Sequence, residues 1–205
     1  MSAFEVVIAR YAEEIKFLPD HYLSNAIVYN KGADDVPDRF ERIIKLPNVG
    51  RESHTYLQHI LTNYDNLADV TLFTQGAILG HNVFPDLTRY EAPGLNIDLA
   101  MNCTFCQPDM WGRIRHTGKW RREFAKGEMR PAGGSLGDFW DTYIKKPKPK
   151  SHRDFRWSHG ATFSVSRELI HRKTRNYYSE LIALVDDHIN PEEGHYFERT
   201  WGYVF

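Results

Sequence analysis

The sequence predicts an α/β fold in which a mainly parallel sheet is covered on both faces. Three short runs, at 4–9, 26–29 and 69–73, have the length and the β-branched, apolar content of buried strands. Their apolar character is continuous rather than alternating, which is typical of strands buried on both faces. A helical pattern separates the second run from the third, so strand and helix alternate as in parallel α/β folds. A chain of 205 residues is expected to form one domain, or at most two small ones.

Two helices are predicted in the first third of the chain. The first strand is followed by a short helix at 12–18, which Pro19 stops because proline cannot continue a helix. The second strand is followed by a loop rich in Asp, Pro and Gly. A longer helix is then expected from about Arg51 to Asn63, because apolar residues recur on one face of it: Tyr56, Leu57, Ile60 and Leu61.

The rest of the chain is less regular. Residues 82–155 hold six prolines and are expected to form short helices and long loops, with one helical stretch from Leu136 to Ile144. Beyond them we predict a strand at 161–166, a helix at 175–187 and a last helix that begins at Pro191. The final WGYVF segment is apolar, which predicts either a packed terminal strand or the cut end of a longer protein.

Charge and cysteine content exclude several classes of protein. The chain has 26 basic and 27 acidic residues, whereas general nucleic-acid binders carry a strong basic excess. No run of 18 apolar residues is present, so no membrane span is expected, and the first residues lack the pattern of a secretory signal. Cys103 and Cys106 cannot form a disulfide framework, and without a second pair we interpret them as structural thiols rather than a zinc site. These features predict a cytoplasmic protein.

Polar residues follow each of the first three predicted strands. In open α/β sheets, ligands bind beyond the carboxyl ends of the strands. The ring of Tyr11 could stack on a nucleobase there and Arg10 could reach a diphosphate, although Tyr11 could equally pack on the next helix. We therefore predict a ligand site formed by three strand ends: Arg10-Tyr11, Asn30-Lys31-Gly32 and Thr74-Gln75-Gly76.

The segment NVGRES at 48–53 lies where a loop enters the longer helix. Gly50 lets the backbone approach a ligand closely, the start of the helix offers free N–H groups, and Arg51 presents a fork that matches phosphate. The alternative is an ordinary helix start capped by Ser53. Because two more polar strand ends are expected nearby, we favour contact with a phosphate or a nucleotide.

The segment EEGHYFER at 192–199 is dense in acid–base groups. Two carboxylates and a histidine within two helical turns could supply a general base. A charged helix face, with Glu198 and Arg199 in ion pairs, is the alternative that composition alone favours.

The order of these segments resembles the GT-A fold of glycosyltransferases. VVIARYAEEI, AIVYNKG, PNVGRESHTYLQHI and DVTLFTQG are similar to a nucleotide-binding half, and FRWSHGATFSVSRELI with NPEEGHYFERTW resembles an acceptor half. The chain is also similar to small fungal and algal proteins and to the amino-terminal glycosyltransferase domain with which chlorella viruses glycosylate their capsid protein. The resemblance implies a single GT-A-like domain over 1–205, with a mainly parallel mixed sheet flanked by helices, a nucleotide-binding half at about 1–80 and an acceptor half at about 81–205.

This resemblance assigns roles to individual residues. It places Glu193 as the general base, with His195 and Glu198 in reserve. In many inverting members of the fold an acidic pair precedes a short helix and is followed a few residues later by arginine, and Glu192-Glu193 with Arg199 looks similar. The acceptor side is implied at Trp157, His159, Gly160 and Ala161, with Trp111, Trp140 and Trp157 as candidate platforms for a sugar. The nucleotide is implied to contact ten residues: Ala9, Arg10, Tyr11, Asn30, Lys31, Gly50, Arg51, Glu52, Thr74 and Gln75.

One departure from the family concerns the metal. Most GT-A enzymes place an Asp-x-Asp pair after the third strand, where this chain has Thr74-Gln75-Gly76. Mg²⁺ and Mn²⁺ prefer carboxylate oxygens. Either a divalent cation is held by Gln75, His81 and the diphosphate, or Arg51 or another cation takes its place.

The resemblance implies transfer of a sugar from a nucleoside-diphosphate sugar, with a UDP-sugar as the expected donor, to a hydroxyl of a glycan or glycoprotein. In a viral setting the acceptor would be the capsid protein and the compartment the host cytoplasm. A non-catalytic module that binds nucleotide sugar or carbohydrate is the alternative. A nicotinamide-dependent oxidoreductase is disfavoured because the glycine fingerprint is absent.

Overall fold

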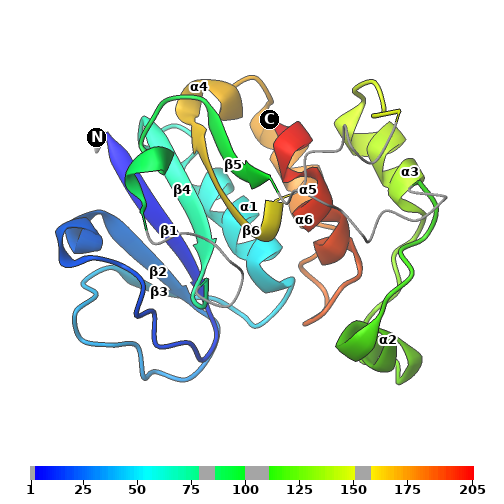
Figure 1. Cartoon of the computed structure of the whole chain (residues 1–205), viewed down its shortest axis with the longest axis horizontal. Coiled ribbons are helices and arrows are strands. Elements are labelled where there is room, and N and C mark those ends of the chain that lie inside the picture. Colours follow the sequence, from blue (N-terminus) through cyan, green and yellow to red (C-terminus); the bar gives the residue numbers. More distant parts are fainter. Residues whose placement is uncertain (1–2, 79–85, 100–110, 151–157) are drawn as a thin grey trace.

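The computed structural model describes residues 3–78, 86–99, 111–150 and 158–205. Within them the chain is a mixed α/β structure built on one six-stranded sheet of order β3-β2-β1-β4-β6-β5 (Figure 1). The mostly parallel sheet that the sequence predicts is therefore confirmed. Its strands are β1 (Phe4–Arg10), β2 (Ala26–Asn30), β3 (Ile43–Lys45), β4 (Val70–Gln75), β5 (Leu95–Leu99) and β6 (Ser158–Ser166).

The directions of the strands decide which side chains can meet at one edge of the sheet. β1 lies between β2 and β4 and is parallel to both, and β3 continues the parallel part beyond β2. β6 runs antiparallel to β4 and to β5. The carboxyl ends of β1, β2 and β4 therefore lie at the same edge as the first residues of β6.

The helices are described by their bounds. The α-helices are α1 (Arg51–Asn63), α2 (Gly118–Ala125), α3 (Leu136–Phe139), α4 (Arg167–Ile170), α5 (Arg175–Ile182) and α6 (Glu193–Val204). A π-helical turn, η3 (Trp140–Ile144), continues α3, and η1 (Asp20–Asn25) and η2 (Thr88–Tyr90) are 3-10 helices.

The two faces of the sheet are buried by different kinds of cover. On β1, Val7 joins the core beneath α1, α5 and α6, whereas Val6 and Ile8 join the core beneath η1, η2 and the loops around them. All three side chains are fully buried. Because successive residues of a strand point to opposite faces, cover on both faces explains why the strand has no polar alternation.

The larger core is rich in aromatic rings. Trp201 of α6 is fully buried and stacks on Phe163 of β6 with ring centres 5.1 Å apart. It stacks on Phe197 one turn earlier at 5.2 Å. The apolar tail of the sequence therefore belongs to the last helix, and the prediction of a terminal strand is wrong. Its side chains fix α6 against the sheet, which sets the position of the acid–base groups at the start of that helix.

The helix predicted at 12–18 is absent. Ile15 has a φ of +51° and is buried, so the backbone turns left-handed in the middle of the segment. The carboxylate of Glu13 accepts hydrogen bonds from the backbone N–H groups of Tyr11 (2.7 Å) and Ala12 (3.1 Å), which organises a loop. Ile15, Phe17 and Leu18 of this loop are buried in the core on the face of the sheet that carries Val6 and Ile8.

Other predicted elements are confirmed, some of them with shifted bounds. The helix at 51–63 is present at its predicted bounds, and the helical stretch at 136–144 is present but ends in the π-helical turn. The helix predicted at 175–187 ends at Ile182. β3, β5 and α2 were not predicted. No helix in the described ranges is both long enough and apolar enough to cross a membrane.

Candidate functional site

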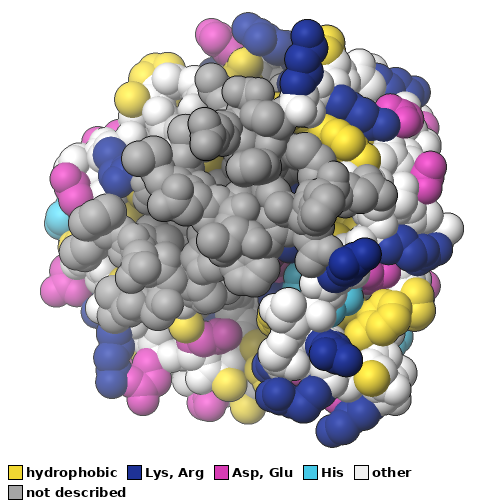
Figure 2. All heavy atoms as spheres, turned by 45° about the vertical axis from the view of Figure 1, so that its right-hand side comes forward, with side chains coloured by type: hydrophobic (Ala, Val, Ile, Leu, Met, Phe, Trp, Pro, Cys, Tyr) yellow, Lys and Arg dark blue, Asp and Glu magenta, His cyan; other side chains and the backbone are white. Residues whose placement is uncertain are grey.

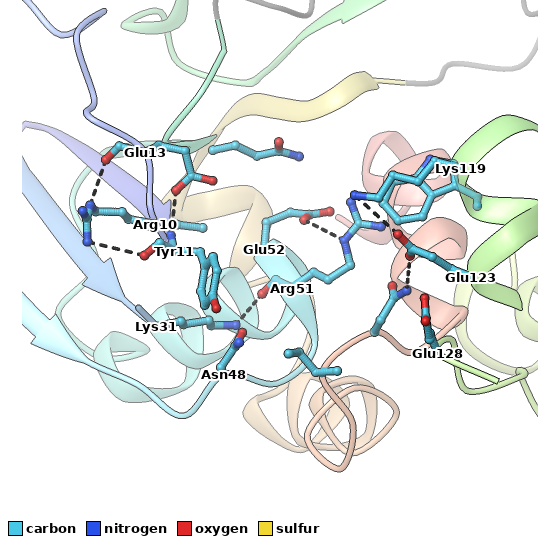
Figure 3. A pocket seen from close by; sticks show the side chains of 15 residues that line it. Arg10, Tyr11, Glu13, Lys31, Asn48, Arg51, Glu52, Lys119, Glu123 and Glu128 are labelled. Atoms are coloured by element: carbon cyan, nitrogen blue, oxygen red, sulfur yellow. Dashed lines mark hydrogen bonds and ion pairs between the residues drawn. The ribbon is translucent and has the colours of Figure 1, made fainter. Parts of the chain in front are cut away.

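A cavity of about 440 Å³ lies at the carboxyl ends of β1, β2 and β4 (Figure 3). The start of α1 forms its floor, and α2 closes one side. The residues that line it come from three strand ends, two helices and the loops beside them: Ala9, Arg10, Tyr11, Glu13, Lys31, Asn48, Arg51, Glu52, Gln75, Lys119, Trp120, Glu123, Glu128, Ile189 and Asn190.

The strand topology brings together most of the residues predicted to bind a nucleotide. Seven of the ten line this cavity: Ala9, Arg10, Tyr11, Lys31, Arg51, Glu52 and Gln75. Asn30, Gly50 and Thr74 each lie next in the chain to a lining residue, and Thr74 and Asn30 are buried. Their convergence follows from the parallel pairing of β1 with β2 and β4. Their role in binding stays a prediction.

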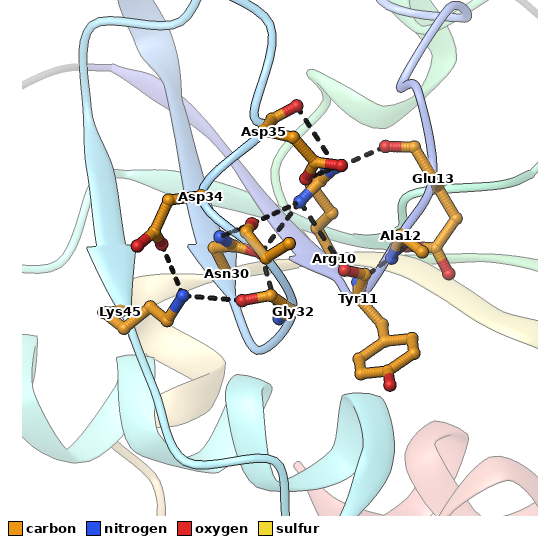
Figure 4. A network of polar contacts seen from close by, with 10 residues as sticks. Arg10, Tyr11, Ala12, Glu13, Asn30, Gly32, Asp34, Asp35 and Lys45 are labelled. Atoms are coloured by element: carbon orange, nitrogen blue, oxygen red, sulfur yellow. Dashed lines mark hydrogen bonds and ion pairs between the residues drawn. The ribbon is translucent and has the colours of Figure 1, made fainter.

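Arg10 has a structural task that the sequence does not reveal. Its guanidinium donates to the Glu13 carbonyl (2.8 Å), to Asn30 Oδ1 (2.9 Å) and to Asp35 Oδ1 (2.6 Å), with further contacts to the carbonyls of Ala33 and Asp35 (Figure 4). The residue is 3% exposed. Since these partners engage all three guanidinium nitrogens, the charge fixes the loop after β2 and does not extend toward a diphosphate.

Lys31 is a buried cation on the wall of the cavity. Its ammonium donates to the carbonyl oxygen of Val49 (2.5 Å) and to that of Arg51. Burial lowers the pKa of Lys31 to about 7, and the nearby Glu52 carboxylate offsets part of that effect. The charge of this side chain is therefore sensitive to any anion that enters the cavity.

The start of α1 has an uncommon backbone. Gly50 and Arg51 have φ values of +62° and +50°, so two successive residues are left-handed. A Cβ at Gly50 would lie 2.2 Å from the carbonyl oxygen of Val185, and therefore only glycine fits. No side chain of the described structure caps α1, and the predicted cap Ser53 is buried with its hydroxyl unpartnered there. The N–H groups of the first turn are thus left for a ligand or for water.

Arg51 projects from this turn toward α2. Its guanidinium lies over the Trp120 ring, 4.4 Å from the ring centre, and its Nε is 3.6 Å from a carboxylate oxygen of Glu52. A terminal nitrogen lies 3.4 Å from Nε2 of His195. Arg51 therefore joins three elements, α1, α2 and α6, at one end of the cavity.

The wall that α2 supplies was missed by sequence reasoning. Trp120, Lys119 and Glu123 line the cavity, and the Glu123 carboxylate accepts a hydrogen bond from Asn190 Nδ2 (3.0 Å). The available signal was the segment GKWRREF, in which an aromatic residue lies among charges. The tryptophans named from the sequence lie elsewhere: Trp111 and Trp140 pack against each other with ring centres 5.0 Å apart, and Trp157 lies outside the described residues.

Glu193, the predicted general base, does not line this cavity. Its carboxylate is 3.1 Å from Arg130 Nη2, and the residue lines a separate cavity of about 330 Å³ beside α3. Its neighbour Glu192 is buried, lies 2.9 Å from His116 Nε2 and accepts the backbone N–H of Ala132 at 2.8 Å. The acidic pair is therefore engaged in holding α6 to the 130–132 segment.

The two reserve candidates lie closer to the cavity. His195 packs on the Trp120 ring at 4.9 Å, and burial together with the charge of Arg51 holds its pKa far below the usual range, so the imidazole is neutral. Glu198 lies 4.0 Å from Nδ1 of His195 and accepts the backbone N–H of Gly160 at 3.2 Å. Its side chain is 20% exposed, which leaves it open to solvent or to a ligand.

Two of the predicted acceptor residues form an irregularity in β6. Gly160 and Ala161 have φ values of +72° and +50°, and the pairing of β6 with β5 shifts in register across this part of the strand. Bulges of this kind are frequent beside functional sites because they re-aim the backbone. Gly160 is thereby brought to Glu198. The backbone of His159 belongs to β6, while its side chain lies outside the described part.

The two residues predicted to hold a metal, Gln75 and His81, supply no carboxylate. Gln75 lines the cavity beside Glu13, whose carboxylate already accepts two backbone N–H groups, and His81 lies outside the described residues. Across the described ranges, no cluster of three or more His, Cys, Asp or Glu could hold a metal ion. These residues do not match the carboxylate-rich coordination that Mg²⁺ and Mn²⁺ prefer.

Residues 6–92 match the family model of a protein of unknown function (DUF3431). This stretch includes β1, β2, α1 and β4, so it contains the strand ends and the helix start that form one half of the cavity. The description of that family names no activity. A comparison with curated proteins found no match.

Proposed function

We propose that this chain is a glycosyltransferase of the GT-A type, which transfers a sugar from a UDP-sugar to a hydroxyl of a glycan. The observation that carries the proposal is the cavity at the carboxyl edge of β1, β2 and β4, where a buried lysine and an uncapped helix start lie side by side. A mixed sheet of this order, with an antiparallel β6 that brings its first residues to the same edge, is consistent with that fold.

The donor would lie with its nucleobase at the β1 end of the cavity. Tyr11 is 55% exposed, so its ring is free to stack on a base. Lys31, Arg51 and the free N–H groups at the start of α1 would hold the diphosphate, because anions bind where positive charge and unpaired donors coincide. Trp120 and the carboxylate of Glu123 would then face the sugar, whose partly apolar ring packs on an indole and whose hydroxyls donate to carboxylates.

The proposed transfer breaks the bond between the anomeric carbon and the diphosphate oxygen and forms a bond to the acceptor oxygen. Negative charge develops on the leaving diphosphate, and Lys31 and Arg51 stabilise it. We assign to Glu198 the carboxylate that takes the acceptor proton, because it is partly open and lies beside Gly160 at the start of β6. No step is routed through a metal.

A non-catalytic module that binds nucleotide sugars is the second candidate. The observation that favours it is the lack of a carboxylate in Thr74-Gln75-Gly76, where most GT-A enzymes hold their cation. Such a module would keep the cavity and its cations but would not turn over a donor.

Calorimetric titration with UDP, UDP-glucose, GDP and NADH, each with and without Mn²⁺, tests the proposal first. We expect UDP and the UDP-sugar to bind and NADH not to bind. Binding that Mn²⁺ strengthens would add a cation to the site, whereas binding without a metal effect would leave the diphosphate to Lys31 and Arg51. If no nucleotide binds, the proposed function is wrong.

Turnover separates the two candidates. Release of UDP from a panel of UDP-sugars, in the presence of glycan acceptors, is expected for the transferase. Tight UDP-sugar binding with neither hydrolysis nor transfer across that panel would favour the binding module.

A further inference from the structure

Positive charge is concentrated on α2 and on the segment that leads to it. Residues 113–126 include six basic side chains and one acidic side chain, in a chain whose net charge is −1. Figure 2 shows Lys and Arg side chains gathered at the lower right of the molecule, in the region of α2. We call these six exposed residues the α2 basic surface: Arg113, Arg115, Lys119, Arg121, Arg122 and Lys126.

Four of these six charges have no carboxylate partner within the described structure. Lys119 lies 3.4 Å from Glu123, and Lys126 lies 3.8 Å from Glu128. Arg113 donates to the carbonyl oxygen of Ala132 at 3.1 Å. The other three arginines of the surface, Arg115, Arg121 and Arg122, have no ion-pair partner among the described residues.

The helix keeps its aromatic side toward the body of the molecule. Trp120 packs on Arg51 and His195, and Phe124, one turn later, stacks on His116 with ring centres 5.5 Å apart. Residues four apart lie on the same side of a helix, so Arg121 and Arg122, which lie between them, point outward and are exposed. No residue of α2 is buried, and Phe124 remains 38% exposed at the edge of the basic side.

We propose that the α2 basic surface docks this protein on an anionic lipid bilayer. Arg115, Arg121 and Arg122, which have no ion-pair partner among the described residues, line neither of the two cavities described above. Exposed charges of this kind are complementary to a flat surface on which negative charge is spread over many headgroups. The exposed edge of Phe124 adds an aromatic group that is favourable at headgroup level. The proposal rests on the charge and placement of α2 and is independent of the proposed function.

Sedimentation with vesicles tests this docking. The protein is incubated with phosphatidylcholine vesicles that contain about 30% phosphatidylserine, or none, and the bound fraction is measured. We expect binding to the anionic vesicles alone, and we expect about 0.5 M salt to release the protein because the Debye length then falls to a few ångströms. An Arg121→Gln/Arg122→Gln variant should bind roughly 30-fold more weakly, since each basic residue near an anionic surface contributes about fivefold.

A matched variant controls for the change in total charge. Lys16→Gln/Arg172→Gln removes two other exposed cations, and it should keep the binding of the natural chain. The proposal would be overturned by any of three results: equal binding to neutral and anionic vesicles, no binding to anionic vesicles, or an equal loss of vesicle binding in both variants. Retention by a soluble acidic polysaccharide without vesicle binding would also overturn it, in favour of a polymeric partner. Circular dichroism tests whether both variants remain folded. If the natural chain binds UDP, unchanged UDP affinity of the variants is a second test of folding.

Discussion

Lys31 is the residue whose charge depends most directly on what the cavity contains. Burial lowers its pKa to about 7, so in the free protein the ammonium is partly deprotonated near neutral pH. A diphosphate bound beside it would favour the charged form and would raise that pKa. Above about pH 7, binding of UDP should therefore take up a proton.

We expect the affinity for UDP to fall as the pH rises from about 7 to about 9, by up to tenfold for each pH unit. Titration calorimetry in two buffers of different ionisation enthalpy measures the proton uptake. Lys31→Met should bind UDP more weakly and without this pH dependence. If the natural chain shows the same UDP affinity at both pH values, Lys31 does not contact the anion.

The same shift has a consequence for folding. The pKa of Lys31 is lower in the folded chain than in the unfolded chain. Between about pH 7 and about pH 10.4 the unfolded chain therefore binds more protons than the folded chain. The contribution of Lys31 to the free energy of unfolding should therefore rise with pH across that window. Below about pH 7 the cost of burying the charge is fully present.

Glu198 and Glu193 provide a matched pair of carboxylates on one helix. Glu198→Gln keeps an oxygen that can accept the Gly160 N–H, but it removes the base, so we expect kcat to fall by about 10²–10⁴-fold with little change in donor affinity. Glu193→Gln should leave kcat nearly unchanged and should lower the free energy of unfolding by about 1–2 kcal/mol, because Arg130 loses part of its pairing. Steady-state kinetics and urea unfolding measure both effects. The reverse pattern would return the base to Glu193.

At the scale of the element, the start of α1 depends on a glycine. Gly50→Ala adds a methyl group that would lie 2.2 Å from the Val185 carbonyl, at a φ of +62°. Gly127→Ala is its control, because Gly127 has a similar φ of +72° with nothing within 4 Å of the added atom. The control measures the cost of placing a non-glycine residue in the left-handed region alone, which is about 1–2 kcal/mol. We expect Gly50→Ala to destabilise the chain by more than this in thermal unfolding. Equal shifts would mean that the segment after α5, which carries Val185, moves aside.

α2 offers a prediction of the opposite kind, in which binding changes and stability does not. None of its residues is buried, yet Trp120 lies over Arg51 on the wall of the cavity. Trp120→Ala should weaken binding of the UDP-sugar by about fivefold to thirtyfold, since the proposed packing of the sugar on the indole would bury apolar surface worth about 1–2 kcal/mol. The melting temperature should change little, because no residue of α2 is buried and the partly exposed contact with Arg51 is weak. Phe124→Ala, on the same helix but outside the cavity lining, should leave the affinity intact, and an equal loss in both variants would indicate a general disturbance of α2.

At the scale of the whole molecule, the sequence predicts one part of the site, the part formed by the ends of the parallel strands. Apolar runs identify β1, β2 and β4, and the rule that parallel strands end at one edge brings Arg10, Lys31 and Gln75 together. β3 escapes prediction because it has three residues, all exposed, and is defined by its pairing with β2. The segment at 12–18 has a helical apolar pattern, but Ile15 turns left-handed there.

The rest of the site depends on contacts between distant parts of the chain. Nothing in the sequence near Arg10 reveals that Asn30 and Asp35 occupy its guanidinium, because the loop that brings them is 20 to 25 residues away. The pairing of Glu193 with Arg130, across 63 residues, is equally hidden, and it is the reason why we propose Glu198 rather than Glu193 as the base. Trp120 lies at the cavity against Arg51 of α1 and His195 of α6, both of which are far from it in the sequence.

The six basic residues at 113–126 make the charge of this protein uneven along the chain, although its net charge is close to zero. Its net charge of −1 predicts weak retention on an anion exchanger and none on a cation exchanger at about pH 7. A sulfonate resin, however, meets one side of the molecule at a time, and residues 113–126 present six cations to it with one carboxylate. We expect the protein to bind that resin, and we expect the Arg121→Gln/Arg122→Gln variant to elute at lower salt. The retention of this protein on an ion exchanger would thus depend on which side faces the resin rather than on its isoelectric point.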